Sequence, residues 1–476
     1  MFPLQAALGL WVCVALAAGC KQPPNPVCVA QADPGRADPA DCAEQLGARC
    51  DTLGSPPTCK LPCQTDADCG RQALFLPTWQ CIDGLCTDCE QDKARCLCHQ
   101  HADCQSKVCD VYDSILPRAA DNPAQPTDRA GRCIAQDLVL YVDNSSSGRC
   151  AASGSHTGRA DDPFCSISDA LALDPGRLPG DGSRRIIRVL GSNRSYGALL
   201  FADTMIAEPV FLFGPGQPHE SDLPAKLNAL SPPISLSGAF PLTVDGFYLD
   251  WLDSATLLSC NEQKAGQLPE IVIRRSYVTS DKSPTHKVAM TLNKCKLTLD
   301  SDWFDGIQGV GLLQLAKDSD TRITNSYFTD TVALSSAGVS VNLISIEMNA
   351  SQFLFSHNTL AGNQPSPGMS SVVGCFMVSF PLDYSIFQGP DLVTGCSIQT
   401  STLDPTSMVL DEISADATRP KYRLSSTRST CCVDTAEAAP AVKWDYFGHR
   451  RPLPGSSVVP SVLNADKGAE ELLPAM

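Results

Sequence analysis

A short repeated unit between Ile271 and Asp330 constrains the fold of this chain more than any other feature. The unit occurs three times, as Ile271–Val278, Leu297–Phe304 and Thr321–Phe328. Each copy alternates apolar and polar residues and ends in an aromatic residue followed by a large apolar one. The aromatic residues of the three copies are Tyr277, Trp303 and Tyr327, and the steps between them are 26 and 24 positions. A strand that recurs at a nearly constant short period, with no helical pattern between copies, predicts a solenoid.

Similar strand-like pieces lie on both sides of the three copies. Upstream they are Ile186–Leu190, Val210–Phe213 and Leu242–Leu249, and downstream they are Phe353–Leu360 and Tyr384–Phe387. The large apolar residues that close the later pieces are expected to point into the core, and they are Val278, Phe304, Phe328, Leu360 and Phe387. Asn325 and Asn358 are expected to occupy like positions in their copies.

Composition favours an exported, disulfide-bonded protein. The chain has 476 residues, enough for several domains and a sizeable core, and a formal net charge of −16. No cluster of Lys or Arg stands out, so the sequence predicts no nucleic-acid partner. There are 24 cysteines, which indicates disulfides in an oxidising compartment and metal sites in a reducing one.

An apolar run, Ala6–Gly19, precedes Cys20 and is too short to span a bilayer. The sequence Leu16-Ala17-Ala18-Gly19-Cys20 resembles the bacterial lipobox, although the leucine stands one place early and no Lys or Arg precedes the run. The resemblance implies a signal peptide over residues 1–19, lipidation of Cys20, and attachment to the outer membrane or cell surface. The alternative is an ordinary signal peptide on a secreted protein, with Cys20 in a disulfide. Loss of Cys13 and lipidation of Cys20 would leave an even number of cysteines for pairing.

The N-terminal region is rich in cysteine and poor in large apolar residues, so disulfides must hold it together. Residues 20–58 are expected to form a tether with the first cysteines, 59–109 cysteine-rich modules, and 110–137 a linker. The segments Cys63–Cys69 and Cys98–Cys104 repeat one another and resemble the small EGF-like or Dickkopf-like modules of exported proteins. A zinc site has ligand-like spacing at Cys86, Cys89, Cys96, Cys98, His99 and His101. Oxidising conditions favour disulfides instead, so neither a metal nor a cofactor is predicted.

The rest of the chain, from Leu138 onward, resembles a single protein family at both of its ends. Leu138–Asp143 is a strand, followed by a Gly/Ser loop and the segment Asp162–Leu171; near the end stand Asp445–Pro452 and Asp466–Glu470. Together these resemble the right-handed parallel β-helix proteins of the pectin-lyase-like class. The resemblance implies a mainly β fold: a right-handed parallel β-helix solenoid over residues 138–472, preceded by a small disulfide-rich, loop-rich region. It also implies that Cys150 pairs with Cys165.

Six cysteines follow in the solenoid. Cys375 and Cys396 are 21 residues apart, near the length of one coil, and are expected to pair between adjacent coils. Cys431 and Cys432 are candidates for a vicinal disulfide, and Cys260 and Cys295 complete an even set.

The catalytic motifs of this class are incomplete. Where polygalacturonase-type hydrolases carry Asn-Thr-Asp and Arg-Ile-Lys, the chain has Asn358-Thr359-Leu360 and Arg322-Ile323-Thr324, and it has no Gly-His-Gly. Pectate lyases need clustered carboxylates for calcium and a basic residue that takes a proton. The best such cluster is Asp300, Asp302 and Asp305 with Lys294, Lys296 and Arg322. Acidic residues also line the turns of any solenoid.

The leading hypothesis is therefore a membrane-anchored lipoprotein whose β-helix binds a glycan or a partner protein without catalysis. A polysaccharide lyase or glycosidase with Asp302 and Asp305 in its site is the alternative, and a structural envelope protein is a further one. A row of outward aromatic residues beside aligned acids would favour binding or catalysis over a purely structural role. Converging acidic and basic residues in a groove would favour the enzyme.

Overall fold

The protein is described by a computed structural model. The described residues are 49–51, 58–60, 79–82, 85–88, 97–98, 100–104, 106–112, 114–115, 131–145, 150, 156–180, 182–197, 199–201, 206–216, 224–228, 234–236, 240–251, 256–261, 268–280, 288–309, 311–315, 319–333, 344–346, 352–364, 371–375, 379–389, 393–398, 400–404, 410–412, 420, 422–424, 436–437, 445–446 and 464–465. The chain divides into two compact units, Met1–Cys96 and Leu97–Met476. Cys20, Cys431 and Cys432 lie outside the described residues.

The first unit contains two short antiparallel hairpins in its described part. Strand β1 (Arg49–Asp51) pairs with β2 (Thr58–Lys60), and β3 (Trp79–Ile82) pairs with β4 (Leu85–Asp88). In the backbone register of the two hairpins, Cys50 is paired with Cys59 and Cys81 with Cys86. The small, cysteine-rich strands agree with the loop-rich region that the sequence predicts.

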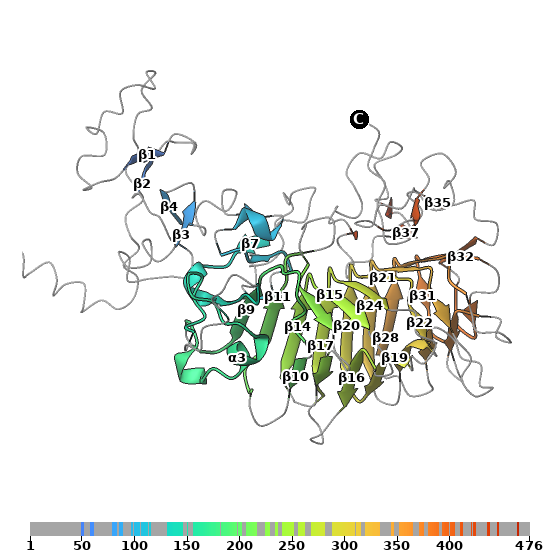
Figure 1. Ribbon diagram of the computed structural model, residues 1–476. Coiled ribbons are helices and arrows are strands. Elements are labelled where there is room, and N and C mark those ends of the chain that lie inside the picture. Colours follow the sequence, from blue (N-terminus) through green and yellow to red (C-terminus); the bar gives the residue numbers. More distant parts are fainter. Residues whose placement is uncertain are drawn as a thin grey trace, which may run out of the picture. The chain divides into compact units, whose positions relative to one another are not determined.

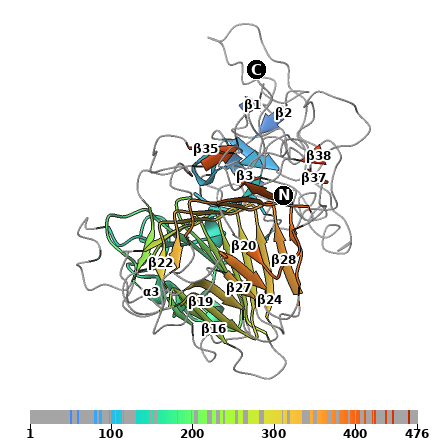
Figure 2. The same ribbon diagram turned by 90° about the vertical axis from the view of Figure 1, so that its right-hand side faces the viewer.

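The second unit is a parallel β-helix with three walls, each a parallel sheet (Figures 1 and 2). The first wall consists, in spatial order, of β31 (Leu382–Asp383), β28 (Gln352–Ser356), β24 (Asp320–Thr324), β20 (Lys296–Asp300), β17 (Glu270–Arg274), β14 (Pro241–Asp245), β11 (Val210–Phe213), β9 (Arg185–Val189) and β8 (Leu140–Val142). The second wall consists of β12 (Lys226–Asn228), β15 (Tyr248–Trp251), β18 (Tyr277–Ser280), β21 (Trp303–Asp305), β25 (Tyr327–Thr329), β29 (Thr359–Ala361), β32 (Ile386–Gln388) and β34 (Thr402–Asp404). The third wall consists of β10 (Leu199–Phe201), β13 (Ile234–Leu236), β16 (Leu258–Asn261), β19 (Val288–Asn293), β23 (Gly311–Leu315), β27 (Ile344–Ile346), β30 (Val373–Cys375) and β33 (Val393–Thr394).

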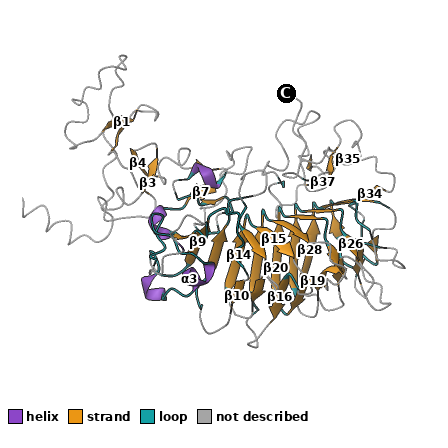
Figure 3. Ribbon diagram, in the orientation of Figure 1, coloured by secondary structure: helices purple, strands orange, loops and turns teal. Residues whose placement is uncertain are grey.

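Beyond the three walls, other described strands of the solenoid part form small pairs, and among the described residues helix is confined to short segments (Figure 3). The pairs are β22 (Gln308–Gly309) with β26 (Val332–Ala333), β35 (Leu410–Glu412) with β36 (Tyr422–Leu424), and β37 (Ala436–Glu437) with β38 (Asn464–Ala465). The short helices are η2 (His101–Asp103), η3 (Gln136–Leu138), α3 (Ile167–Leu171) and η5 (Pro175–Arg177). The predicted mainly β fold with a parallel solenoid is therefore confirmed. Among the described residues, no helix is long and apolar enough to cross a membrane.

The repeated unit in the sequence is the corner between the first and second walls. Tyr277, Trp303 and Tyr327 are register partners on β18, β21 and β25. The five closing residues are also partners in register, Val278, Phe304, Phe328, Leu360 and Phe387. All five are buried, and the rings of Phe304 and Phe328 stack with centroids 4.8 Å apart. The prediction that these residues point into the core is confirmed, because alternate residues of a strand face opposite sides of the wall.

A two-residue turn joins the first wall to the second in successive coils. Its first residue has a positive φ between 47° and 58° in five coils, at Arg275, Ser301, Asn325, His357 and Tyr384. In the preceding coil this position is Gly246, where an added Cβ would lie 2.7 Å from Gly216. The left-handed conformation turns the chain sharply and places the second turn residue inside.

The second turn residues form a hydrogen-bonded ladder, which we call the turn ladder. Each backbone N–H donates to the side chain of the next coil, over 2.9–3.3 Å: Phe247 to Ser276, Ser276 to Asp302, Asp302 to Ser326, Ser326 to Asn358, Asn358 to Ser385 and Ser385 to Ser401. The ladder satisfies buried backbone donors that no strand can reach. The expectation that Asn325 and Asn358 share a position is wrong, since Asn358 is level with Ser326 and Asn325 stands one residue earlier.

Among the described residues of the solenoid part of the second unit there are three disulfides. Cys150 is joined to Cys165, Cys260 to Cys295, and Cys375 to Cys396. Cys165 stands just before helix α3, whose cap Ser166 accepts a hydrogen bond from the backbone of Asp169. The disulfide between Cys150 and Cys165 is the one that the resemblance implies. The disulfide between Cys375 and Cys396 is the one that the length of a coil indicates.

A cysteine-rich part of the second unit packs on the outside of the first wall. This docked module comprises the described residues from Leu97 to Asp137, with a sheet of β5 (Leu97–Cys98), β7 (Gly131–Cys133) and β6 (Cys109–Asp110). Disulfides join Cys98 to Cys109 and Cys104 to Cys133. Its apolar residues share a cluster with outward residues of β8, β9 and β11, comprising Val108, Ile115, Ile134, Val139, Tyr141, Ile186 and Phe213. Ile115 and Ile134 are thus buried, although they fall in the segment that the sequence assigns to a linker.

Candidate functional site

The outer face of the second wall carries a row of aromatic side chains, one per coil. The aromatic row consists of Tyr248, Tyr277, Trp303 and Tyr327, which are register partners on adjacent strands. Ring centroids are 4.9 Å apart for Tyr248 and Tyr277 and 4.6 Å for Tyr277 and Trp303. This spacing follows from the distance between neighbouring strands, about 4.8 Å. Regular backbone pairing therefore brings the rings into contact.

The two ends of the aromatic row differ in exposure. Tyr248 and Tyr277 are half-buried. Trp303 and Tyr327 are buried, and Tyr446 from the C-terminal part of the chain packs edge-on against Tyr327 with centroids 5.0 Å apart. The indole N–H of Trp303 donates to the hydroxyl of Thr329 over 2.8 Å. The accessible part of the row is therefore the end at β15 and β18.

Carboxylates lie beside the accessible end. Asp250 and Asp305 each stand two residues after an aromatic residue of the row, on the same face of the wall. The Asp305 carboxylate accepts a hydrogen bond from the Thr329 hydroxyl over 2.6 Å and from the Tyr277 hydroxyl over 3.2 Å. Burial, Asp250 and Asp305 raise the pKa of Tyr248 to about 12. Burial and Asp305 likewise raise the pKa of Tyr277, so both phenols stay protonated and can donate hydrogen bonds.

Lys226 lies at one end of the row, with its Nζ 5.1 Å from the ring centroid of Tyr248. Lys226 and Tyr277 thus stand on the strands on either side of Tyr248, and the planes of the two tyrosine rings are tilted by 55°. The half-buried residues at this end carry phenol hydroxyls and carboxylates. These groups suit hydrogen bonding to a polar ligand more than stacking of a flat one.

Asp302 and Asp305, the alternative catalytic pair, lie on opposite sides of the wall. Asp302 belongs to the turn ladder and is fully buried, and one carboxyl oxygen accepts the Ser276 N–H over 2.9 Å. Burial raises its pKa well above the ordinary value. A carboxyl in this position cannot reach a polymer on the outside. The pattern of three nearby aspartates did not reveal this, because the turn at Ser301 reverses the direction of the next side chain.

The basic residues of the proposed lyase cluster are also apart from Asp305. Lys296 and Arg322 belong to β20 and β24 of the first wall, and Lys294 precedes β20. Asp305 belongs to β21 of the second wall. Asp300 accepts hydrogen bonds from Thr324 and Asn325 of the next coil over 2.6 and 2.9 Å. The structure therefore does not gather these six residues into one site.

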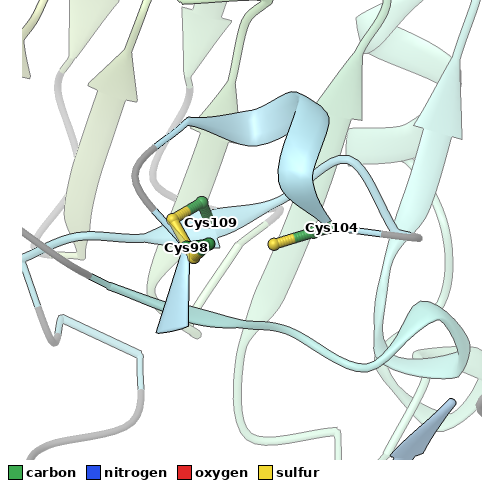
Figure 4. Close-up of side chains that lie close together, drawn as sticks. All are labelled: Cys98, Cys104 and Cys109. Carbon is green, nitrogen blue, oxygen red and sulfur yellow. A yellow bond between two sulfur atoms is a disulfide. The ribbon is translucent and has the colours of Figure 1, made fainter. Parts of the chain in front are cut away.

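Of the candidate zinc ligands, Cys89, Cys96 and His99 lie outside the described residues, and those that the structure describes are engaged otherwise. The sulfurs of Cys98, Cys104 and Cys109 lie within 4.8 Å of one another (Figure 4), but Cys98 is bonded to Cys109 and Cys104 to Cys133. Cys86 is also in a disulfide, and both ring nitrogens of His101 lie at hydrogen-bond distance from N–H groups, those of Cys109 and Arg275. Disulfide sulfurs are not thiolate ligands, so this group does not fit zinc.

No protein family, curated protein or solved structure matches this chain. The candidate site is therefore assigned from the geometry of this chain alone. The repeated unit in the sequence marks Tyr277, Trp303 and Tyr327 as regular aromatic positions but assigns them no binding role, and Tyr248 and Asp250 were missed. The signal was present, because Tyr248-Leu249-Asp250 repeats the pattern of Trp303-Phe304-Asp305.

Proposed function

We propose that the protein is a cell-surface lipoprotein of the pectin-lyase-like β-helix class that binds a glycan without cleaving it. Cys20 carries the lipid anchor, and the aromatic row with Asp250 and Asp305 is the contact surface. The observation that carries the proposal is the row of outward aromatic residues beside aligned carboxylates on one wall. A structural envelope component needs no such row.

The charges of the surface define the class of glycan. Asp250 and Asp305 stand on the two strands next to β18, which carries Tyr277, and the chain as a whole has a formal net charge of −16. Such a surface repels polymers of uronic acids, because like charges brought together raise the free energy of binding. Sugar hydroxyls and sugar amines donate hydrogen bonds to carboxylates. The ligand is therefore a neutral or amine-bearing glycan.

Affinity electrophoresis of the purified protein in gels containing xylan, chitosan or polygalacturonate tests this proposal. We expect retardation by xylan or chitosan and none by polygalacturonate. Tyr277→Ala should weaken binding about tenfold, since loss of about 1.4 kcal/mol raises Kd by that factor. Thr298→Ala, at a half-buried position on the outer side of the first wall, is the matched control and should bind normally.

Retardation by polygalacturonate, or equal binding by Tyr277→Ala and the parent protein, would contradict the assignment of this surface. An ultraviolet-absorbing product from polygalacturonate would favour the lyase instead. The anchor is tested separately, because Cys20→Ala should move the protein from the membrane fraction to the soluble fraction. A mutant that still fractionates with membranes would exclude lipidation at Cys20.

A further inference from the structure

His101 lies at the centre of the contact between the docked module and the first wall. Its ring is 1% exposed, and its edge meets the ring of Phe213 with centroids 5.6 Å apart. Nδ1 accepts the backbone N–H of Cys109 over 3.0 Å. Nε2 lies 3.0 Å from a terminal nitrogen of Arg275. The imidazole therefore joins two parts of the chain that are 174 residues apart in sequence.

Three guanidinium groups surround this ring from the side of the solenoid. They belong to Arg188 on β9, Arg274 on β17 and Arg275 in the following turn. The Asp245 carboxylate on β14 accepts the Nε–H groups of Arg274 and Arg275 over 2.9 and 2.7 Å. The module contributes Tyr112, whose ring lies 4.0 Å from the Arg274 guanidinium, and Ser114, whose hydroxyl accepts from Arg274 and donates to Asp110. Tyr141 on β8 donates its hydroxyl proton to the Ser106 carbonyl.

A protonated His101 does not fit this arrangement. A neutral imidazole has one nitrogen lone pair, whereas the protonated ring has none and carries two N–H groups. Both ring nitrogens face N–H donors, so protonation removes the remaining acceptor and adds a positive charge beside three others. Burial, and after it Arg275, Arg188 and Arg274, hold the pKa of His101 well below its ordinary value.

We propose that proton uptake by His101 releases the docked module from the first wall, so that mildly acidic conditions uncover the outer side of β8, β9 and β11. The two disulfides keep the module intact, and its chain connection to β8 keeps it tethered. The surface uncovered combines apolar side chains, Tyr141, Ile186 and Phe213, with the neighbouring buried arginines, since both are buried in the docked state. This device is separate from the aromatic row, which lies on the second wall.

The direction of the pH effect follows from linkage. A histidine whose pKa is lower when docked stabilises docking fully above its free pKa of about 6.5, and this contribution is lost as the pH falls below that value. Each pH unit below it weakens docking up to tenfold until the docked pKa is reached. Between pH 7.5 and pH 5.0 we therefore expect the docking equilibrium to weaken by up to about 30-fold.

Hydrogen–deuterium exchange of the full chain, with labelling times corrected for the intrinsic pH dependence of exchange, measures this release. Peptides from residues 97–115 and 140–142 should lose protection between pH 7.5 and pH 5.0, while peptides covering β17 to β25 keep theirs. His101→Asn retains an acceptor near Nδ1, and His101→Gln retains one near Nε2. Neither titrates, so a variant that docks at pH 7.5 should stay docked at pH 5.0. His156→Gln, which replaces a histidine paired with Asp162, should behave as the parent protein.

Unchanged protection of the parent protein across this pH range would overturn the proposal, as would an equal acid response in a docked His101 variant. If both His101 variants lack protection already at pH 7.5, the pH profile of the parent and His156→Gln proteins decides. A loss of protection that is retained in His156→Gln and is confined to the peptides from residues 97–115 and 140–142 supports release through His101. A profile that disappears in His156→Gln overturns it.

Discussion

The inner and outer sides of the second wall share the same strands but differ in what determines them. On β18, β21 and β25 the outward residues are Tyr277, Trp303 and Tyr327, and the next residues, Val278, Phe304 and Phe328, point inward. The inward side is closed by ring stacking and by the turn ladder. The outward side ranges from buried to half-buried and carries polar groups.

This difference shows how a solenoid can separate stability from binding. A residue that faces the core is packed on all sides, so its loss leaves a cavity that neighbours fill only in part. An outward residue at the accessible end of the row, Tyr248 or Tyr277, contacts its neighbours in the row and is only half-buried. Adjacent positions in the sequence can therefore change almost independently.

The largest expected effect tests the inner side. Phe328→Ala removes a buried ring that stacks on Phe304 and should lower the free energy of unfolding by about 3–5 kcal/mol. Tyr277→Ala, on the outer side, should cost about 1 kcal/mol because its ring is half-buried. Denaturant unfolding of both variants measures the contrast, and equal losses would show that the two sides do not differ in this way.

A substitution in the turn ladder should lower the free energy of unfolding by a smaller amount. The Asn358 side chain accepts the Ser326 N–H and donates to the Ile323 carbonyl, both over 2.9 Å. Asn358→Ala should therefore cost about 1–3 kcal/mol, since it leaves buried polar groups unpaired. Asn358→Ser is the matched control, because serine occupies the ladder at Ser276, Ser326 and Ser385, and it should cost less. Equal unfolding midpoints for the two variants would argue against the ladder as a source of stability.

Asp302→Asn, which replaces one carboxyl oxygen by an amide nitrogen, tests whether the pKa of the buried Asp302 carboxyl is raised. Its folded pKa is raised above the ordinary value of 3.8, so ionisation opposes folding as the pH rises above that value. Asp302→Asn keeps the acceptor for Ser276 and should stabilise the protein by a margin that grows by about 1.4 kcal/mol per pH unit until the folded pKa is reached. Asp305→Asn is the control on the outer side. A stability difference for Asp302→Asn that is constant from pH 4 to pH 8 would contradict a raised pKa.

The sequence alone determined the solenoid, its coil register at the first corner and the inward direction of the closing residues. These features are local, because alternation along a strand decides which side each residue faces, and a period near the length of one coil decides its partners. The regular aromatic positions at Tyr277, Trp303 and Tyr327 were visible for the same reason. The third wall was not anticipated, since the chain between the walls varies in length from coil to coil.

Tertiary structure alone decided which side of the wall each aspartate occupies and where the cysteine-rich segment lies. Asp302 and Asp305 are three residues apart, but the left-handed backbone at Ser301 sends Asp302 into the ladder, while strand alternation sends Asp305 outward. The contact of His101 with Arg275 joins residues 174 positions apart. A pairing over that distance depends on the folded surface of the first wall, and no pattern within either segment specifies it.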